Sequence, residues 1–343
     1  MSGGHIMPAI YFFEVAPGER AFLKTFRPKG YSIRHFAERA EEVNASTLRR
    51  ADIISVFIYS HVTANILKKA PRLKLIATRS TGFDHIDIET ARKRSIAVAN
   101  VPFYGENTVA EHTFALILGL SRKVHQAYFR TIRGDFSFEG LQGFDLKGKI
   151  LGIIGTGHIG LHAIRIATGF GMKVLAYDIE RNAFMAETLG FSYVPFNELL
   201  AKSDIISLHA PYRKETRHMI NKSNINTIKR GALLINTARG GLVETEALAL
   251  ALDQGILAGA GLDVLEGEEL IKEERQILSK EYSVDHLKTL LQNHILLNRE
   301  NVVITPHIAF NSKEAFLRIL ETTVANINAF LSGKPENLVA PHR

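Results

Sequence analysis

Apolar residues in the first hundred positions come in short runs, separated by polar stretches with helical spacing. The runs predict strands over residues 9–15, 51–59, 73–80 and 95–102. Each run is apolar almost throughout, which is typical of strands buried on both faces. Because these strands alternate with helical segments, the pattern favours βαβ units and a mainly parallel sheet.

The same alternation restarts after the glycine-rich stretch 138–149. A second parallel sheet is predicted, with strands over residues 149–155, 173–178, 204–210, 231–238, 257–264 and 301–306. Residues 107–130 form one long helical pattern that is apolar on more than one face, so this helix is expected to be buried or shared with a partner. Residues 312–331 predict an amphipathic helix that packs back onto the first domain.

Composition narrows the classes of protein that fit. The 343 residues, 46% hydrophobic and 22% charged, are enough for about two domains. The chain has no cysteine, which excludes disulfides, thiolate metal ligands and cysteine nucleophiles, and no metal is expected. The net charge is +7, but the lysines and arginines are scattered among acidic residues and form no long basic run, so no nucleic-acid partner is expected. No long apolar run or signal peptide is present, which predicts a cytoplasmic protein without a membrane partner.

A nucleotide-binding pattern follows the strand predicted over 149–155. The segment KILGIIGTGHIG places Gly155, Gly157 and Gly160 where the strand passes into a helix, and the next strand ends in Asp178. In this context the glycines permit a tight turn, a close approach to a pyrophosphate and packing of helix on strand, while the acid binds a ribose hydroxyl. NAD is therefore favoured over NADP, although Arg181 lies nearby. A glycine-rich turn with a surface aspartate is the alternative interpretation.

Charged residues follow three of the predicted strands. Arg239 comes after 231–238, Asp263 and Glu268 end or follow 257–264, and His307 follows 301–306. Taken one at a time, Arg239 fits a surface ion pair, Glu268 a solvated acidic face, and His307 a histidine that caps or packs. Ligands of open parallel sheets bind at the carboxyl ends of the strands, where these residues meet. Together they offer a fork for a carboxylate, a proton donor and an acid that orients the donor, as hydride transfer to a 2-keto acid requires.

Motifs spread over nearly the whole chain carry a family resemblance. They are TRSTGFDHID, NVPFYGENTVAEHT, GTGHIG, SLHAPYRKETRHMIN, NTARGGLVETEAL, GLDVLEGEE and TPHIAFNS. With these motifs the chain resembles the NAD-dependent D-isomer-specific 2-hydroxyacid dehydrogenases, and the D-lactate dehydrogenases among them. By position in the motifs, the resemblance assigns catalysis to Arg239, Glu268 and His307, with Asp263 in a supporting role.

Further site residues are implied by the resemblance. Cofactor contacts are expected from Gly155, Gly157, His158, Ile159, Gly160, Asp178, Ala210, Pro211, Thr216, Thr237, Ala238, Arg239 and Asp263. Substrate contacts are expected from Thr81, Gly82, Tyr104, Arg239 and Phe310. Tyr104 and Phe310 match the aromatic lining of lactate-type pockets, while taken alone both would be core aromatics.

The resemblance also implies an architecture. Two Rossmann-like, doubly wound parallel-sheet domains are expected, a substrate domain over 1–102 and 308–343 around an inserted NAD-binding domain over 103–307. A homodimer is expected through residues 107–130. The charged helical segment between Glu268 and Asn301 is expected to cover the NAD-binding domain.

The implied reaction is reversible hydride transfer between NADH and pyruvate, giving D-lactate. His307 would exchange the proton, Arg239 would hold the carboxylate, and Glu268 would orient the imidazole and favour its charged form. Closure of the two domains would exclude water. Alternatives are another D-2-hydroxyacid dehydrogenase, of 2-hydroxyisocaproate, glycerate or glyoxylate type, and an NAD-sensing corepressor that binds peptides.

Overall fold

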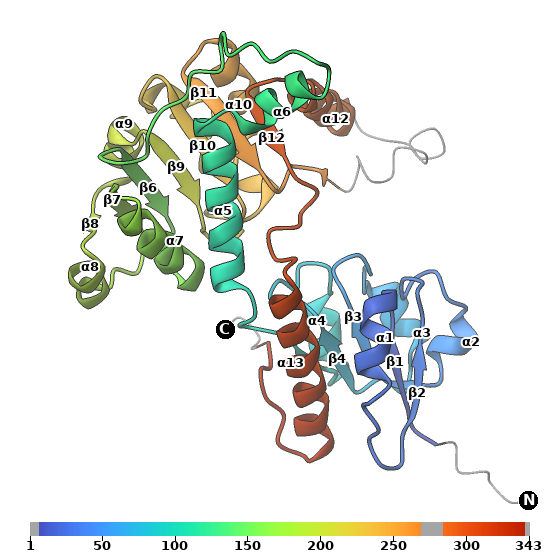
Figure 1. Ribbon diagram of the computed structural model, residues 1–343. Coiled ribbons are helices and arrows are strands. Elements are labelled where there is room, and N and C mark those ends of the chain that lie inside the picture. The colour runs from blue at the N-terminus through green and yellow to red at the C-terminus, as the bar shows by residue number, and fades with distance from the viewer. Residues whose placement is uncertain (1–6, 269–283, 340–343) are drawn as a thin grey trace, which may run out of the picture. The chain divides into compact units, whose positions relative to one another are not determined.

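The computed structural model describes residues 7–268 and 284–339 (Figure 1). Its backbone separates into two compact units, 1–104 with 312–343 and 105–311. Within the described residues, each unit is built on one parallel sheet with helices on both faces.

The first unit contains a five-stranded sheet in the order β2-β1-β3-β4-β5 within the described residues. Its strands are β1 (Ala9–Phe12), β2 (Ser32–His35), β3 (Ala51–Val56), β4 (Leu75–Thr78) and β5 (Ala97–Ala99). Its helices are α1 (Pro17–Leu23), α2 (Ala45–Leu48), α3 (Ala64–Lys69), α4 (Ile88–Lys93) and α13 (Lys313–Leu331). All strand pairs are parallel.

Two apolar cores cover the two faces of this sheet. One core joins the strands to α2, α3 and α4, and the other joins them to α1 and α13. Successive residues of a strand point into opposite cores. On β3, Ile54 lies in the first core and Ile53 in the second. The helix predicted over 312–331 is confirmed and packs on this sheet, and the hydroxyl of Ser312 accepts from Ala315 N at its start.

The second unit contains a seven-stranded parallel sheet in the order β12-β11-β10-β9-β6-β7-β8 within the described residues. Its strands are β6 (Ile150–Ile154), β7 (Lys173–Tyr177), β8 (Ser192–Tyr193), β9 (Ile205–Leu208), β10 (Ala232–Asn236), β11 (Leu257–Leu262) and β12 (Val302–Ile304). Its helices are α5 (Glu106–Ser121), α6 (Val124–Thr131), α7 (His158–Gly169), α8 (Ala183–Leu189), α9 (Phe196–Lys202), α10 (Thr245–Asp253) and α12 (Val284–Leu297), with short 3₁₀ turns η1 (Ile225–Thr227) and η2 (Gly240–Leu242). The order reverses between β6 and β9, as in dinucleotide-binding folds.

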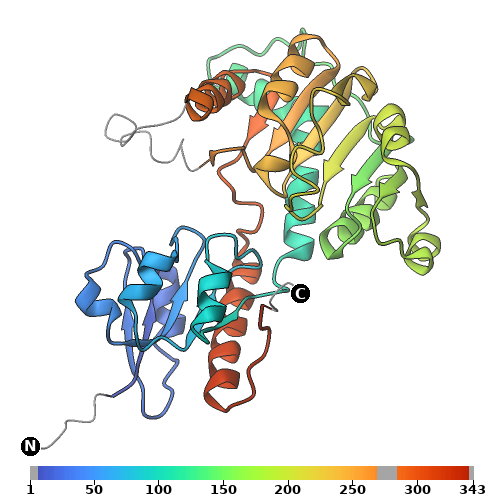
Figure 2. The same ribbon diagram turned by 180° about the vertical axis from the view of Figure 1, so that it is seen from behind.

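Helices again cover both faces of the sheet. On one face α5 and α7 lie side by side (Figures 1 and 2) and share a core with α8. The other face packs against α9, α10, α12 and η1. On β6, Ile153 enters the first core and Ile154 the second, which explains why this strand is an unbroken apolar run.

All ten strands predicted from the sequence are present inside their predicted ranges, so the doubly wound fold class is confirmed. The edge strands β2 and β8 were not predicted. The single helix predicted over 107–130 is wrong, because Lys123 takes a left-handed conformation (φ 52°) between α5 and α6. The new direction is held by His125 and Gln126, whose Nε2 atoms lie 2.8 and 2.7 Å from the carbonyl oxygen of Glu300.

The two units meet in sequence after Tyr104 and after Asn311, whereas boundaries after residues 102 and 307 were expected. Arg318 Nε donates to the carbonyl oxygen of Tyr104 (2.6 Å), which keeps residues 103–104 with the first unit. The amides of Ile308 and Ala309 bind a carboxylate of the second unit and keep 308–311 there. Of the expected covering segment, 269–283 lies outside the described residues, while α12 packs beside α10. None of the described helices is long and apolar enough to span a membrane.

Candidate active site

The predicted cofactor and catalytic residues of the second unit share one edge of its sheet. They lie in the turns that follow β6, β7, β9, β10, β11 and β12. Because all these strands are parallel, their carboxyl ends face the same side. The edge includes the reversal between β6 and β9, where such sheets bind ligands.

The turn between β6 and α7 uses its three glycines differently. Gly155 has φ 99°, and a Cβ there would lie 2.7 Å from Ala210 N. A Cβ on Gly160 would overlap the carbonyl oxygen of Gly155. A Cβ on Gly157 would meet no protein atom within 4 Å, so the fold itself does not require glycine at this position.

Gly157 caps α7, and His158 and Ile159 form its first turn. A helix start attracts anions through its amides and its dipole. A glycine with free space beside its Cα at this point therefore fits the close approach of a pyrophosphate.

Asp178 directly follows β7 and reaches back to the glycine turn. Its Oδ2 accepts from Thr156 N (2.6 Å) and Thr156 Oγ1 (3.0 Å), and its Oδ1 accepts from Glu180 N (3.0 Å). The Tyr193 hydroxyl from β8 lies 2.8 Å from Thr156 Oγ1. Arg181, whose guanidinium lies 5.8 Å from the ring centre of Tyr193, stacks on that ring. The carboxylate is thus held beside the turn that would carry the pyrophosphate.

The exit of β9 carries Ala210 and Pro211, and Thr216 closes the loop that follows. Thr216 Oγ1 donates to the carbonyl oxygen of Pro211 (2.7 Å) and accepts from Arg213 N (2.8 Å). Beside them, burial lowers the pKa of His209 to about 4, so this ring is neutral near pH 7. His209 Nε2 lies 2.9 Å from Ser207 Oγ, which gives the partly buried ring a polar partner.

His307 follows β12 and lies against Glu268. Its Nδ1 lies 2.8 Å from Glu268 Oε1, and both side chains are partly exposed. With Nδ1 turned to the carboxylate, Nε2 is the ring nitrogen that remains for a substrate. The backbone of His307 is left-handed (φ 57°), which is uncommon for a residue other than glycine and concentrates at functional sites.

Asp263, which follows β11, fixes this strained backbone. Its carboxylate accepts from the amides of Ile308 (2.9 Å) and Ala309 (2.8 Å) and from Thr305 Oγ1 (2.5 Å). Its carbonyl oxygen accepts from His307 N (2.9 Å). His112 of α5 completes the cluster, with Nε2 3.0 Å from Thr305 Oγ1 and 3.5 Å from Asp263 Oδ1. Asp263 is 1% exposed, so it acts on the loop from inside the protein.

Arg239 lies in the turn after β10. Asn236 shapes this turn, since its Oδ1 accepts from Ala238 N (3.1 Å) and its Nδ2 donates to the carbonyl oxygen of Arg239 (2.9 Å). Thr237 Oγ1 lies 2.9 Å from Thr113 Oγ1 of α5. The backbone that carries the guanidinium is therefore held on two sides.

The remaining predicted residues divide between the units. Phe310 belongs to the second unit, and its ring meets that of His307 edge to face with 6.4 Å between centres. Thr81, Gly82 and Tyr104 belong to the first unit. In the turn after β4, Ser80 Oγ donates to the carbonyl oxygen of Gly82 (2.6 Å), and Thr81 Oγ1 ties the turn to the chain after β5 by donating to the carbonyl oxygen of Val101 (2.8 Å).

Several residues that shape the site were not predicted from the sequence. In the second unit they are His112, Thr113, Thr156, Asn236 and Thr305. In the first unit, the fully buried Arg79, next to the turn at Thr81, pairs with Glu19 (3.1 Å) and was not predicted either. All six lie inside the motifs quoted above, and this position was the available signal. Apart from Asn236, which binds its own turn, these residues contact segments distant in sequence, and no local pattern reports such contacts.

Comparison with known proteins identifies the family. A sequence profile described as "D-isomer specific 2-hydroxyacid dehydrogenase, NAD binding domain" matches residues 114–309. The chain belongs to this family. The matched region is the family's NAD-binding domain, and NAD is the cofactor.

Named relatives agree over most of their length. A 2-hydroxyacid dehydrogenase homolog of Haemophilus influenzae is 39% identical, over 87% of this chain and 90% of its own. The glyoxylate reductase of Thermococcus litoralis is 38% identical, over 85% of this chain and 84% of its own. The solved structure of D-lactate dehydrogenase from Aquifex aeolicus, complexed with NAD and lactic acid, has a TM-score of 0.87 and 38% identity, and the match covers 97% of this chain and 100% of that one.

Proposed function

We propose that the chain is an NAD-dependent D-lactate dehydrogenase that interconverts pyruvate and D-lactate. The observation that carries this proposal is the contact between His307 and Glu268, made at the sheet edge that also bears the glycine turn, Asp178 and Arg239. An imidazole held by a carboxylate has a defined tautomer and can exchange a proton through its other nitrogen.

In the reducing direction, Nε2 of His307 gives a proton to the carbonyl oxygen of the keto acid. Glu268 accepts a hydrogen bond from Nδ1–H and keeps the ring oriented. Arg239 pairs its guanidinium with the substrate carboxylate, since a planar fork matches two carboxylate oxygens. Asp263 keeps the His307 loop in its left-handed conformation. Thr81, Gly82 and Tyr104 stay predicted substrate contacts from the first unit.

The cofactor, when bound, supplies the hydride for C2 of the substrate. We assign its pyrophosphate to Gly155, Gly157 and the start of α7 at His158 and Ile159, and its ribose to Asp178. The exits of β9 and β10, together with Thr216 and Asp263, are assigned the remaining contacts. The main support for this assignment is Gly157, where the protein leaves room for a side chain and the fold does not require glycine.

A panel of 2-keto acids tests the proposed activity. We expect NADH consumption with pyruvate and D-lactate as the product in chiral analysis. Glyoxylate is the second candidate, because a glyoxylate reductase is among the similar proteins. Preferred turnover of glyoxylate would replace the substrate assignment. L-lactate as the main product, or no turnover of any 2-keto acid, would contradict the proposal.

The ribose assignment predicts a change in cofactor preference. Asp178→Ala removes both the acceptor for the 2′-hydroxyl and the repulsion of a 2′-phosphate, and Arg181 remains nearby to attract one. We expect the ratio of kcat/KM for NADH over NADPH to fall about ten- to a hundredfold. Glu187→Ala on α8, which also deletes an acid of this unit, should leave the ratio unchanged. An unaltered ratio in Asp178→Ala would place the ribose elsewhere.

We also propose a homodimer, supported by an exposed apolar surface on and after α6. Tyr128, Phe129, Phe136 and Phe138 are each more than half exposed, reaching 88% at Phe138. Such a surface is typical of an interface. A mass of one chain in light scattering would contradict the dimer. The cytoplasmic location stays a prediction from the sequence.

A further inference from the structure

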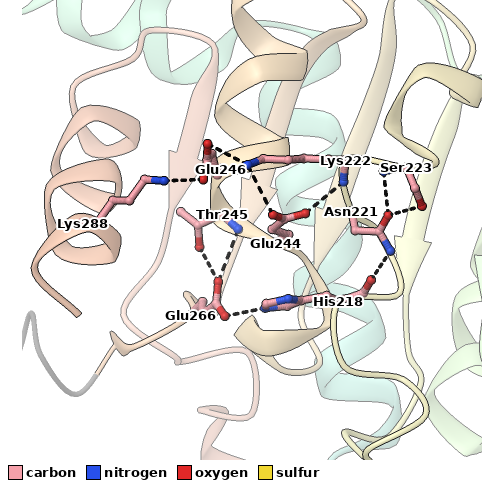
Figure 3. A network of polar contacts seen from close by, with 9 residues as sticks. All are labelled: His218, Asn221, Lys222, Ser223, Glu244, Thr245, Glu246, Glu266 and Lys288. Carbon is pink, nitrogen blue, oxygen red and sulfur yellow. Dashed lines mark hydrogen bonds and ion pairs between the residues drawn. The ribbon is translucent and has the colours of Figure 1, made fainter. Parts of the chain in front are cut away.

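A second contact between a histidine and a glutamate lies close to the first. Figure 3 shows His218 facing Glu266, with 2.5 Å between Nε2 and Oε1. The other oxygen of Glu266 accepts from Thr245 Oγ1 (2.9 Å) and Thr245 N (3.3 Å) at the start of α10. One carboxylate thus receives donors from two separate segments. The proposed reaction gives neither His218 nor Glu266 a role.

The backbones around this contact are packed against each other. A Cβ on Gly240 would overlap the peptide between Leu265 and Glu266, so the turn that begins at Arg239 lies directly on the chain that leads to Glu268. His218 N donates to the carbonyl oxygen of Gly241 (2.8 Å). Three segments therefore meet here, around residues 218, 239–245 and 265–268.

The backbone conformation of His218 indicates that contacts with neighbouring segments hold the residue in place. Its backbone is left-handed (φ 49°), a conformation that costs free energy in residues other than glycine. Bonds hold it on both sides, because His218 N binds Gly241 and the His218 carbonyl oxygen accepts from Asn221 Nδ2 (2.7 Å). The side chain is thereby aimed at Glu266.

We propose that His218 and Glu266 form a clasp that positions Arg239 and Glu268 for the reaction. This inference rests on the proposed function. Glu266 holds the chain two residues before Glu268, and its two partners hold it against the turn that carries Arg239. The clasp sets where the substrate carboxylate is held relative to the acid that orients His307. His218 and Glu266 are positioning residues, because each acts through another residue.

A matched pair of variants isolates the hydrogen bond. His218→Phe keeps a ring but removes the donor, while His218→Gln keeps a donor nitrogen that can reach Glu266. We expect His218→Phe to lower kcat/KM for pyruvate about ten- to a hundredfold, through both kcat and KM, as loss of a supporting contact does. We expect His218→Gln to retain most of the activity.

Affinity for NADH, followed by its fluorescence, should not change in either variant. The loop from Pro211 to Thr216 is closed by its own hydrogen bonds and does not need the imidazole. Lys288→Gln is the control within the same network. It removes an exposed pair with Glu246 (2.6 Å; Figure 3), and exposed pairs contribute little. Its kinetics should equal those of the unaltered protein.

Hydrogen exchange of residues 239–245 and 263–268 provides a readout independent of turnover. Exchange should accelerate in His218→Phe and stay unchanged in His218→Gln. Equal activity losses in the two variants, or unchanged exchange in His218→Phe, would overturn the clasp while leaving the proposed function intact. Faster exchange with full activity would overturn the positioning role. An unaltered protein that reduces no 2-keto acid would contradict the proposed function and the positioning role together.

Discussion

Replacing His307 by asparagine is expected to abolish most keto-acid reduction while leaving the fold and NADH binding intact. Asparagine is chosen because it tolerates the left-handed backbone found at this position (φ 57°) and can still donate to Glu268. It cannot give a proton to the substrate near neutral pH. Loss of a general acid lowers rates by about 10²- to 10⁴-fold, and we expect kcat/KM for pyruvate to fall by that factor.

Stopped-flow single turnover with preformed enzyme and NADH is the measurement, since it separates chemistry from product release. His162→Asn makes the same chemical change on α7, where the ring pairs with Arg165, and should retain full activity. If His307→Asn retained more than a tenth of the activity, the proton would come from another group. If its NADH affinity also collapsed, the damage would be to the loop that Asp263 holds.

Most of the fold was predictable because of how its strands are buried. A strand such as β6, with Ile153 and Ile154 in opposite cores, reads as an unbroken apolar run and is hard to miss. The edge strands lack this signal. β2, with the sequence SIRH, is nowhere fully buried, and β8 has only two residues. Such strands are defined by their neighbour in the sheet, which a local pattern does not contain.

The break between α5 and α6 shows the same limit in a helix. The sequence around Lys123 has no proline and no glycine beyond Gly119, so its helical pattern continues without interruption. The chain turns because His125 and Gln126 bind the carbonyl oxygen of Glu300, about 175 residues away. A tertiary contact of this kind overrides local propensity.

Within the site, the rule that ligands bind at strand ends selected Arg239, Asp263 and His307 from the sequence. It could not choose among Glu266, Glu268 and Glu269, the three acids that follow Asp263, of which Glu269 lies outside the described residues. In the structure Glu268 faces His307, whereas Glu266 faces His218. The choice depends on which way each side chain leaves the loop, and that direction is set by the packing of Gly240 and the bonds of Thr245.

Arg239→Gln is expected to damage use of the keto acid far more than use of NADH. The guanidinium can form two charge-assisted hydrogen bonds with a carboxylate, each contributing about 1.5–3 kcal/mol. Glutamine keeps one neutral donor, so we expect kcat/KM for pyruvate to fall roughly 10²- to 10⁴-fold, largely through KM. Arg239→Lys keeps the charge but loses the planar pair of donors, so its kcat/KM for pyruvate should lie between those of the unaltered protein and Arg239→Gln.

The contrast with a substrate that lacks a carboxylate makes the test specific. A simple aldehyde, reduced slowly by the unaltered protein, should be reduced about equally well by Arg239→Gln, because the lost fork has no partner on it. Arg230→Gln removes an exposed guanidinium that donates to the carbonyl oxygen of Gln254 (2.7 Å), and it should change the rate with neither substrate. A fall in NADH affinity with unchanged pyruvate kinetics would mean that Arg239 serves the cofactor. Equal losses on pyruvate and aldehyde would mean that it acts on the carbonyl and not on the carboxylate.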